Sequence, residues 1–392
     1  MRVLMVSSLF QPAWDWGGPV RSMWNLARGL TALGAEVTVL TTNAKQKGVV
    51  DVPTERTEEG VRIITSPIFA RGQSKLASRF GVSVSFWREI VKHTRGADII
   101  HINGFWGLGP VVAVLACAKF GQPMVVSTRG NLQENAINDK ALKKRLAFAL
   151  GVRGLLRAAT AIHYTTLLEE NWSPEWARGL PCIIVPNPME MKPQADGEAF
   201  RAGLGIGAET VVLGSIGRIH RRKGFEIVAR ALGKGSRRDI IWAVVGADEG
   251  YREELVRLAK ELGIDSRLKL VGELKGEQLT QAYAGIDCLV LPSHGENFGN
   301  VVVEAAIQGT PSIVSDQLGL MAWIAENDTG IVLPLEVDAW SETLGALSRE
   351  EIIQRWEPHR LTMLAKASFS IEVVAQQMLE HYERILSNHI YK

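Results

Sequence analysis

The sequence predicts an α/β protein made of two doubly wound domains that face a cleft. Three observations support this fold: short apolar runs alternate with helical stretches, the alternation occurs twice, and a proline-rich segment separates the two halves. Near-continuous apolar strands separated by helices are typical of a parallel sheet covered on both faces. Ligands of such sheets collect at the carboxyl ends of the strands, so both domains are expected to face a shared cleft.

The first half predicts one doubly wound domain. Its β-branched, apolar runs predict strands, and the longer amphipathic stretches between them predict helices. The expected strands are residues 3–7, 36–42, 61–66, 98–103, 124–128, 161–165 and 182–185, with helices at 20–33, 75–95, 109–120 and 140–157.

Three prolines between residues 185 and 193 interrupt this pattern and predict a linker, because proline disfavours both helix interiors and central strands. A second alternation follows. Its expected strands are 211–216, 240–245, 268–271, 288–291, 312–315 and 331–333, with helices at 225–233, 249–262, 277–284, 300–308 and 320–326. Two further helices are expected at the end of the chain, at 350–366 and 371–386.

The composition excludes several classes of protein. Its 46% hydrophobic and 22% charged residues are ordinary for a soluble protein, and a net charge of +2 gives no global field for nucleic acid. Three cysteines in apolar runs indicate reduced thiols. The start lacks a signal-peptide pattern, and no apolar run approaches the roughly 18 residues that span a bilayer. We therefore expect a cytoplasmic protein that touches a membrane at most from outside.

Two carboxylates bracket the start of the helix expected at residue 300. Glu296 lies in the preceding turn and Glu304 in the first helical turns. A helix N-terminus attracts phosphate, and carboxylates accept hydrogen bonds from vicinal hydroxyls, so the pair favours a nucleotide sugar. The alternative is that both are ordinary acids placed near a helix start by the dipole.

A basic loop follows the first strand of the second half. Arg218 and Lys223 lie on either side of a short turn that leads into a helix, and Gly217 precedes them. Two cations beside a helix start can hold a diphosphate and stabilise a departing nucleoside diphosphate. A merely exposed basic loop is the alternative. The segment from Val271 to Lys275, which ends another strand and includes Gly272 and Leu274, is expected to hold the base through backbone groups.

The first half has candidate residues at three strand ends. Gly17 and Gly18 precede a helix and permit close approach of a phosphate. Trp14 and Trp16 lie in the same loop, where they either bind a sugar or lipid or cover the sheet edge. Arg21, in the next turn, either meets an acceptor phosphate or is solvated.

The other strand ends carry His101 with Trp106, and Arg129. A guanidinium at a strand end implies an anionic partner, whereas a lone histidine is more often a satisfied core residue. The basic helix expected at 140–157 either docks on anionic lipid or covers the sheet with its lysines solvated. No H-E-x-x-H, C-x-x-C, P-loop or G-x-S-x-G pattern occurs in the sequence, so no metal site is predicted.

Taken together, these motifs resemble the retaining glycosyltransferases of the GT-B fold, in family 4. Glu296 and Glu304 match the family's E-x7-E spacing, and GRIHRRKG supplies Arg218 and Lys223. The glycine pair, the Val-Pro-Asn-Pro linker and the final helix also fit, so the resemblance covers nearly the whole chain. It implies a Rossmann-like acceptor domain, residues 1–186 completed by a terminal helix 370–392, and a Rossmann-like donor domain, residues 187–369.

The resemblance also implies roles for the site residues. Arg218 and Lys223 would hold the diphosphate, Glu304 the ribose, and Glu296 the transferred sugar, with no metal and no cofactor. The implied donor-binding set is Gly17, Gly18, Gly217, Arg218, Lys223, Gly272, Leu274, Glu296, Asn297, Phe298, Gly299, Asn300, Val301 and Glu304. The implied acceptor-binding set is Trp14, Trp16, Arg21, His101, Trp106 and Arg129, and the implied catalytic set is Arg218, Lys223, Glu296 and Arg129.

One departure concerns Arg129, which stands where many members carry a histidine. This version resembles enzymes of bacterial surface polysaccharide assembly. The resemblance implies transfer of a hexose from a UDP- or GDP-linked sugar to a hydroxyl of a glycan or lipid-linked glycan, with peripheral contact to the inner membrane. Two alternatives stay open. One is a nucleotide-sugar 2-epimerase or a phosphorylase of the same fold, and the other is a non-enzymatic sugar-binding protein.

Overall fold

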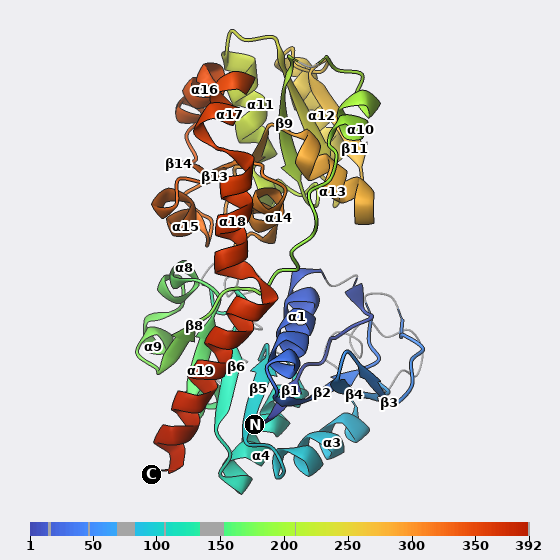
Figure 1. Ribbon diagram of the computed structural model, residues 1–392, viewed down its shortest axis with the longest axis vertical. Helices are drawn as coiled ribbons and strands as arrows, with labels where there is room; N and C mark the ends of the chain where they lie inside the picture. The colour runs from blue at the N-terminus through green and yellow to red at the C-terminus, as the bar shows by residue number, and fades with distance from the viewer. Residues whose placement is uncertain are drawn as a thin grey trace. The chain divides into compact units, whose positions relative to one another are not determined.

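The computed structural model describes residues 1–14, 17–45, 48–68, 83–105, 107–133, 153–207 and 209–390. The chain forms two compact units (Figure 1). The N-terminal unit comprises Met1–Glu190 and Ser370–Lys392, and the C-terminal unit comprises Met191–Phe369. The sequence placed this boundary at 186/187. Each unit holds its own sheet, and the predicted pair of α/β domains is confirmed.

The N-terminal unit contains an eight-stranded sheet in the order β3-β4-β2-β1-β5-β6-β7-β8. All neighbours pair in parallel except β3 and β4, which are antiparallel. The strands are β1 (Arg2–Val6), β2 (Glu36–Thr42), β3 (Glu55–Glu58), β4 (Val61–Ser66), β5 (Ile99–Asn103), β6 (Met124–Ser127), β7 (Ala161–Tyr164) and β8 (Cys182–Ile184).

Helices cover both faces of this sheet (Figure 1). One core joins α3 (Val84–Thr94) and α4 (Leu108–Phe120) to the strands, and the other joins α1 (Gly18–Ala32) and α19 (Ile371–Ile390). The last helix packs against α1 at Gly29, where an added Cβ would lie 2.7 Å from the Ala375 Cβ. The unit also contains the shorter helices α7 (Arg153–Arg157), α8 (Leu167–Asn171) and α9 (Glu175–Arg178).

The C-terminal unit contains a six-stranded parallel sheet in the order β11-β10-β9-β12-β13-β14. Its strands are β9 (Val211–Ile216), β10 (Ile240–Val245), β11 (Leu268–Gly272), β12 (Cys288–Leu291), β13 (Ser312–Ser315) and β14 (Gly330–Leu333). Its helices are α10 (Glu198–Gly203), η3 (Arg221–Lys223), α11 (Phe225–Lys234), α12 (Arg252–Glu261), α13 (Gly276–Gly285), α14 (Asn300–Ile307), α15 (Met321–Glu326), α16 (Val337–Ala346), α17 (Arg349–Arg355) and α18 (Pro358–Phe369).

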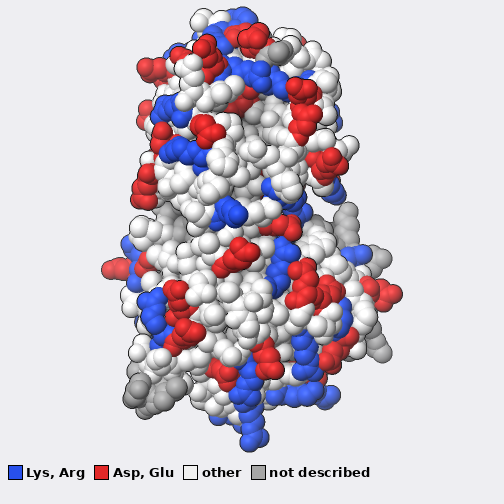
Figure 2. Space-filling model, in the orientation of Figure 1, with Lys and Arg blue, Asp and Glu red and all other residues white. Residues whose placement is uncertain are grey.

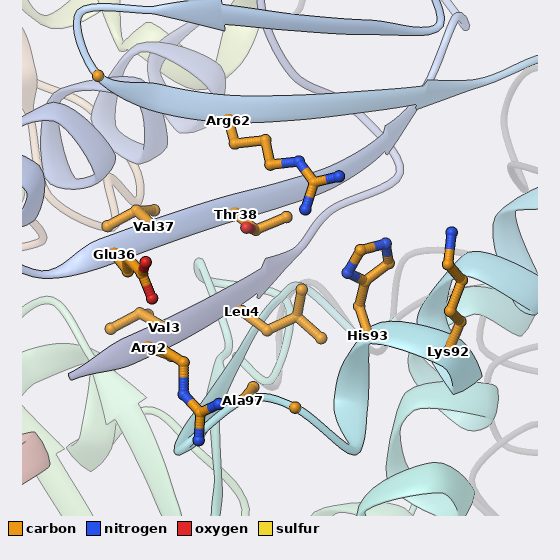
Figure 3. Close-up of a pocket in the computed structure, with 12 residues that line it drawn as sticks. Arg2, Val3, Leu4, Glu36, Val37, Thr38, Arg62, Lys92, His93 and Ala97 are labelled. Carbon is orange, nitrogen blue, oxygen red and sulfur yellow. The ribbon is translucent and has the colours of Figure 1, made fainter.

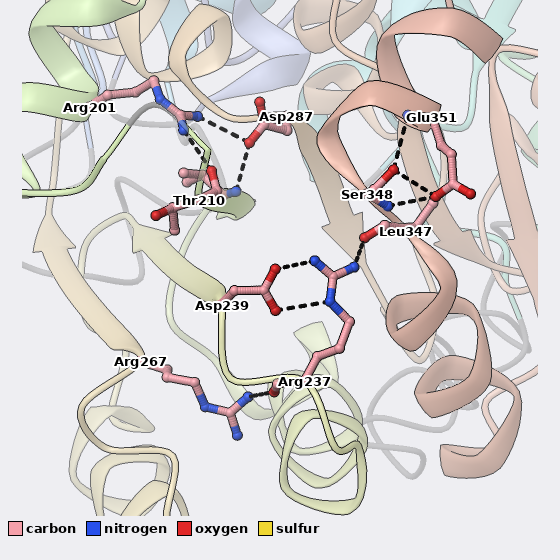
Figure 4. Close-up of polar contacts among 10 residues, drawn as sticks. Arg201, Thr210, Arg237, Asp239, Arg267, Asp287, Leu347, Ser348 and Glu351 are labelled. Carbon is pink, nitrogen blue, oxygen red and sulfur yellow. Dashed lines mark hydrogen bonds and ion pairs between the residues drawn. The ribbon is translucent and has the colours of Figure 1, made fainter.

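A buried carboxylate ties the outer elements of this unit to its sheet (Figure 4). Asp287, which precedes β12, accepts hydrogen bonds from the Arg201 guanidinium of α10 at 3.0 Å and from the backbone N–H of Val212 at 2.7 Å. Its other oxygen accepts from Arg349 of α17. A capping box between Ser348 and Glu351 begins that helix. One carboxylate therefore fixes the ends of two helices against the central strand.

Several expected elements differ from the structure. The single helix expected at 350–366 is wrong, because Pro358 cannot donate a backbone hydrogen bond and instead begins α18 after α17 has ended. The strand β3 and the helix α16 were not expected from the sequence. Of the helix expected at 75–95, residues 75–82 lie outside the described residues, as do residues 140–152 of the expected basic helix.

Charged side chains of both signs lie on the face of the molecule that Figure 2 draws. Figure 2 shows acidic and basic side chains interspersed over the face that it draws, in keeping with 44 basic and 42 acidic residues. Within the described ranges, none of the helices combines the length and the apolar character that crossing a membrane requires.

Candidate functional site

The C-terminal unit has a topological switch point between β9 and β12. These central strands are neighbours, and the sheet grows outward from them through β10 on one side and β13 on the other. Loops at the carboxyl ends of such strands form the usual ligand site of open parallel sheets. The loop after β9 carries Arg218 and Lys223, and the loop after β12 carries Glu296.

A glycine brings these two loops together. Gly224, directly after η3, has a φ of 70°, and a Cβ added there would lie 1.8 Å from the carbonyl oxygen of Pro292. Only glycine allows this left-handed backbone and this approach at once. The contact places the end of the basic turn against the start of the loop that follows β12.

Lys223 and Glu296 meet as a result. The Lys223 Nζ donates to Glu296 Oε2 at 2.5 Å, and their side chains are 17% and 27% exposed. The two sequence-predicted residues are therefore in direct contact. As an ion pair at the switch point, they offer a cation for a phosphate and a carboxylate for a hydroxyl, provided that a ligand separates them.

Glu304 lies in the second turn of α14 and contacts a neighbour that its position in the sequence did not reveal. The Tyr283 hydroxyl of α13 donates to Glu304 Oε2 at 2.5 Å. The helix itself begins after Gly299, which has a φ of 92° and no side-chain cap. The ring of Phe298, a predicted donor-binding residue, is buried and packs edge-on against Phe369.

The remaining predicted donor residues are more dispersed. Arg218 is exposed and forms a bidentate ion pair with Glu249, at 2.8 and 2.9 Å. Gly217 and Gly272 both have positive φ angles and lie at the ends of β9 and β11. Leu274 follows β11 and is partly buried. Of the two cations predicted to bind the diphosphate of the sugar donor, Arg218 is therefore the one that the structure does not bring to Glu296.

The N-terminal unit has a corresponding switch point between β1 and β5, where Asn103 ends β5 and its amide contacts Ser7 after β1. Arg129 reaches this point from the loop after β6. Its Nε donates to Asn103 Oδ1 at 2.8 Å, and its Nη1 donates to Ser22 at 3.0 Å and to Asn187 Oδ1 at 2.5 Å. The described residues give Nη2 no acceptor.

Arg129 is therefore a cation among neutral acceptors. No carboxylate of the described residues lies within ion-pair distance of its guanidinium. Burial lowers the pKa of Arg129 to about 10, partly opposed by the charge of Glu169, so the side chain stays protonated at neutral pH. A partly buried guanidinium that no carboxylate of the described residues contacts, and whose Nη2 has no acceptor among them, suits an anionic group.

His101 has a different environment from the one predicted. It is 1% exposed, and both ring nitrogens have protein partners: Tyr382 of α19 at Nδ1, and Ser127 at Nε2. The Ser127 hydroxyl is also hydrogen-bonded to Nδ1 of His163. The Nε2 of His163 donates to the carbonyl of Val185 at 2.8 Å. Burial holds the pKa of both histidines well below the usual range, to about 3 for His163. This position favours a structural role over the predicted acceptor contact.

The loop before α1 holds the other predicted residues. Gly17 is the N-cap of α1 with a φ of 76°, Gly18 begins the helix, and Arg21 is exposed in its first turn. Trp14 is 40% exposed. Trp16 and Trp106 lie outside the described residues.

The partners that hold these residues were not identified from the sequence. Ser22 and Asn187 hold Arg129, and Tyr283 holds Glu304. Asn187 had a signal in the sequence, since it lies between two prolines of the linker. The others are ordinary helix residues whose contacts arise only in the folded chain.

A pocket of about 400 Å³ lies elsewhere, at the amino ends of β1, β2 and β4 (Figure 3). Its Arg2, Arg62 and Lys92 are already paired with Asp98, Glu55 and Glu89. These three cations of the pocket are thus paired within the protein, and the pocket lies at the end of the sheet opposite to the strand ends that carry Arg129 and Asn103. We therefore take each switch point as a candidate site within its own unit.

Comparisons with known proteins assign the family. The model described as glycosyl transferases group 1 matches residues 196–361, and the model described as glycosyl transferase 4-like domain matches residues 17–188. The D-inositol 3-phosphate glycosyltransferase of Nocardia farcinica is 32% identical over 201 residues, which are 49% of this chain and 44% of that protein. The protein of the same name from Saccharomonospora viridis is 32% identical over 272 residues, 64% of this chain and 62% of that protein.

The chain thus spans about half the length of the curated relatives that it matches. The structure of Anabaena Alr3699/HepE in complex with UDP and glucose covers 98% of this chain and 100% of its own, with a TM-score of 0.71 at 18% identity. This likeness shows the fold. Because the two family matches together span most of the chain, the protein belongs to the GT-B glycosyltransferases of the family 4 type.

Proposed function

We propose that this protein is a retaining, metal-independent hexosyltransferase that uses a nucleoside-diphosphate sugar, UDP- or GDP-linked, as its donor. The contact between Lys223 and Glu296 carries the proposal. A lysine ammonium suits a phosphate and a carboxylate suits a sugar hydroxyl, and this contact joins one of each at the switch point of a single sheet. The HepE structure, which holds UDP and glucose on a similar fold, supports this class of donor.

The donor would enter by an exchange of partners. Lys223, with Arg218 turned from Glu249, would contact the diphosphate, which frees Glu296 to accept hydroxyl hydrogen bonds from the hexose. Glu304 would accept from the ribose hydroxyls. The glycine pair before α1 and the backbone from 297 to 301 would lie along the phosphates and the sugar.

The acceptor would be a hydroxyl compound that carries an anionic group, such as a phosphate-bearing glycan or lipid-linked glycan. The guanidinium of Arg129, which no carboxylate of the described residues contacts, supports this choice. The name of the relatives from Nocardia and Saccharomonospora, which specifies a phosphorylated acceptor, points the same way. Trp14 and Arg21 would contribute further contacts to the acceptor. The reaction would take place in the cytoplasm, at or near the inner membrane, in surface polysaccharide assembly.

The reaction would proceed with retention at the anomeric carbon. The bond from that carbon to the phosphate oxygen breaks, and a bond to the acceptor oxygen forms on the same face. The acceptor proton passes to the departing phosphate, while Lys223 and Arg218 stabilise the charge that develops on it. Glu296 would orient the sugar and exchange no proton.

Thermal-shift titrations with UDP, GDP and their glucose, galactose and mannose derivatives test the donor. A ligand at 100 times its Kd stabilises by about 2.7 kcal/mol, so one nucleotide should raise the Tm with concentration. Lys223→Gln should abolish this rise and lower kcat by about a hundredfold or more. Lys234→Gln, an exposed lysine paired with Asp338 at the far end of α11, is the matched control.

Two outcomes would contradict the proposal. One is the absence of any nucleotide-dependent shift in the wild-type protein, and the other is a shift in Lys223→Gln equal to that of the wild type. Turnover of the nucleotide sugar without an acceptor would indicate the epimerase instead. Loss of transfer in EDTA would contradict metal independence.

A further inference from the structure

A buried carboxylate, Glu169, is hydrogen-bonded to the residues directly before and after Arg129 in the sequence. Glu169, in α8, is 0% exposed and accepts four hydrogen bonds, two at each oxygen. Its Oε1 accepts from the Thr128 hydroxyl at 2.6 Å and from the Gly130 backbone N–H at 2.5 Å. Its Oε2 accepts from the backbone and from the hydroxyl of Thr165, both at 2.7 Å. Glu169 thus holds the residues before and after Arg129 to the end of β7.

The backbone of Arg129 needs such support. Its φ of 51° lies in the left-handed region, which is strained for a residue other than glycine and persists only where the surroundings impose it. This backbone turns the side chain toward Asn103, Ser22 and Asn187. A relaxed turn with negative φ would direct the guanidinium elsewhere, so the geometry of the candidate acceptor site depends on the turn.

A carboxylate fits this position better than an amide. Four donors converge on two oxygens, and the NH₂ group of a glutamine would replace one acceptor by a donor. No lysine or arginine of the described residues lies within ion-pair distance of Glu169. Its negative charge is close enough to raise the pKa of Arg129 against the effect of burial. Burying an unpaired charge is costly, which favours a role beyond packing.

We propose that Glu169 is a positioning residue for the transfer reaction: it fixes the left-handed turn at Arg129 and thereby aims the guanidinium at the anionic group of the acceptor. The inference rests on the proposed function, in which Arg129 contacts the acceptor. It adds a residue that touches neither substrate. A misaligned Arg129 would bind the acceptor poorly, whereas the donor site on the other unit would be unchanged.

The first measurement does not depend on activity. In the full chain with ¹⁵N-labelled arginine, the Arg129 Nε–H, which donates to Asn103, should exchange slowly with water. Glu169→Gln should accelerate this exchange by about tenfold or more, because the turn loosens. Glu170→Gln, the next residue along α8, is the matched control and should leave the exchange unchanged. Unchanged exchange in Glu169→Gln would overturn the proposal.

The second measurement is a double-mutant cycle on kcat/KM for the acceptor. Glu169→Gln should lower this constant by about tenfold to a hundredfold, as misplacement of a contact does, with the UDP thermal shift retained. In an Arg129→Ala background the same substitution should have almost no further effect. Equal effects in both backgrounds would assign Glu169 to stability alone and overturn the positioning role. Failure of the proposed function would show differently, as a missing nucleotide shift in the wild type.

Discussion

The two units build their switch-point sites by different means. In the C-terminal unit, a backbone contact at Gly224 brings two loops together, and the charged residues Lys223 and Glu296 neutralise each other. In the N-terminal unit, partly buried hydrogen bonds hold Arg129 among neutral partners, and no carboxylate of the described residues contacts its guanidinium. The cation of the C-terminal site is thus already paired with a carboxylate, whereas that of the N-terminal site is held in position without one among the described residues.

This difference implies different behaviour toward ligands. On the proposed function, a diphosphate would have to displace Glu296 from Lys223, so part of its attraction would go into breaking an existing ion pair. An anion at Arg129 displaces no carboxylate, because the described residues offer none in contact. The N-terminal site is therefore preorganised in geometry, whereas the proposed function would require the C-terminal site to reorganise when the donor binds.

Gly224→Ala should have the largest effect on stability, because it disrupts the close backbone approach of Gly224 to Pro292 in the C-terminal unit. The new Cβ would lie 1.8 Å from the Pro292 carbonyl oxygen, at a φ of 70°. Backbone strain and overpacking together should lower the free energy of unfolding by about 3 kcal/mol or more, measured by urea denaturation.

Gly263→Ala supplies the matched control. Gly263 has a φ of 64°, but a Cβ added there would meet nothing within 4 Å, so only backbone strain of about 1 kcal/mol is expected. Equal losses in the two variants would show that the close approach at Gly224 contributes nothing.

Acid should lower the stability of the N-terminal unit, because His101 and His163 are buried in their neutral form. The folded-state pKa of His101 and His163 lies below the ordinary histidine value of 6.5, so the unfolded chain binds more protons as the pH falls below that value. Stability is fully present above about pH 6.5 and is lost on acidification toward the folded pKa values. Between pH 7.5 and 5.5 each histidine should remove about 1.4 kcal/mol of unfolding free energy.

Urea denaturation at the two pH values measures this effect, and His101→Gln should flatten the dependence. His93→Gln should flatten it less, since the ring of His93 is only partly buried and its pKa is lowered less severely. A wild-type stability that is equal at both pH values would contradict the neutral state of the buried pair.

Glu296→Gln should give the smallest change, and it tests most directly whether the ion pair distinguishes the C-terminal site from the N-terminal one. Removing this carboxylate frees Lys223, so the affinity for UDP alone should rise by about threefold, although sugar transfer falls. Calorimetric titration with UDP at low and high salt measures the change, and Glu342→Gln on α16 is the control. Weaker UDP binding in Glu296→Gln would mean that the pair does not compete with the diphosphate.

The central strands were predictable because burial on both faces leaves a near-continuous apolar run. The predicted bounds of β2, β9, β10, β12 and β13 agree with the structure. The strand β3, with the sequence ERTE, lacks such a run because it lies at the sheet edge and pairs on one side only. The division between α17 and α18 was signalled by Pro358, which the helical pattern around it obscured.

For the candidate site, the sequence singled out Lys223, Glu296 and Arg129 as candidates, and it could not show which residues hold them. Glu169 looks like an ordinary acid in the first turn of a helix, where the dipole favours it. Its partners Thr128 and Gly130 are about 40 residues away in the sequence, on another strand end. Such contacts depend on sheet order, which no local pattern encodes.

The N-terminal unit is also discontinuous in the chain, and this has a consequence for its synthesis. Val374, Met378 and Tyr382 of α19 belong to its core, but they are translated only after the whole of Met191–Phe369. At about 5–20 residues per second, a ribosome needs about 10–40 s to make that intervening segment. Throughout this interval the apolar face beside α1 lacks its last helix, so the nascent chain offers chaperones a binding surface that the finished protein no longer has.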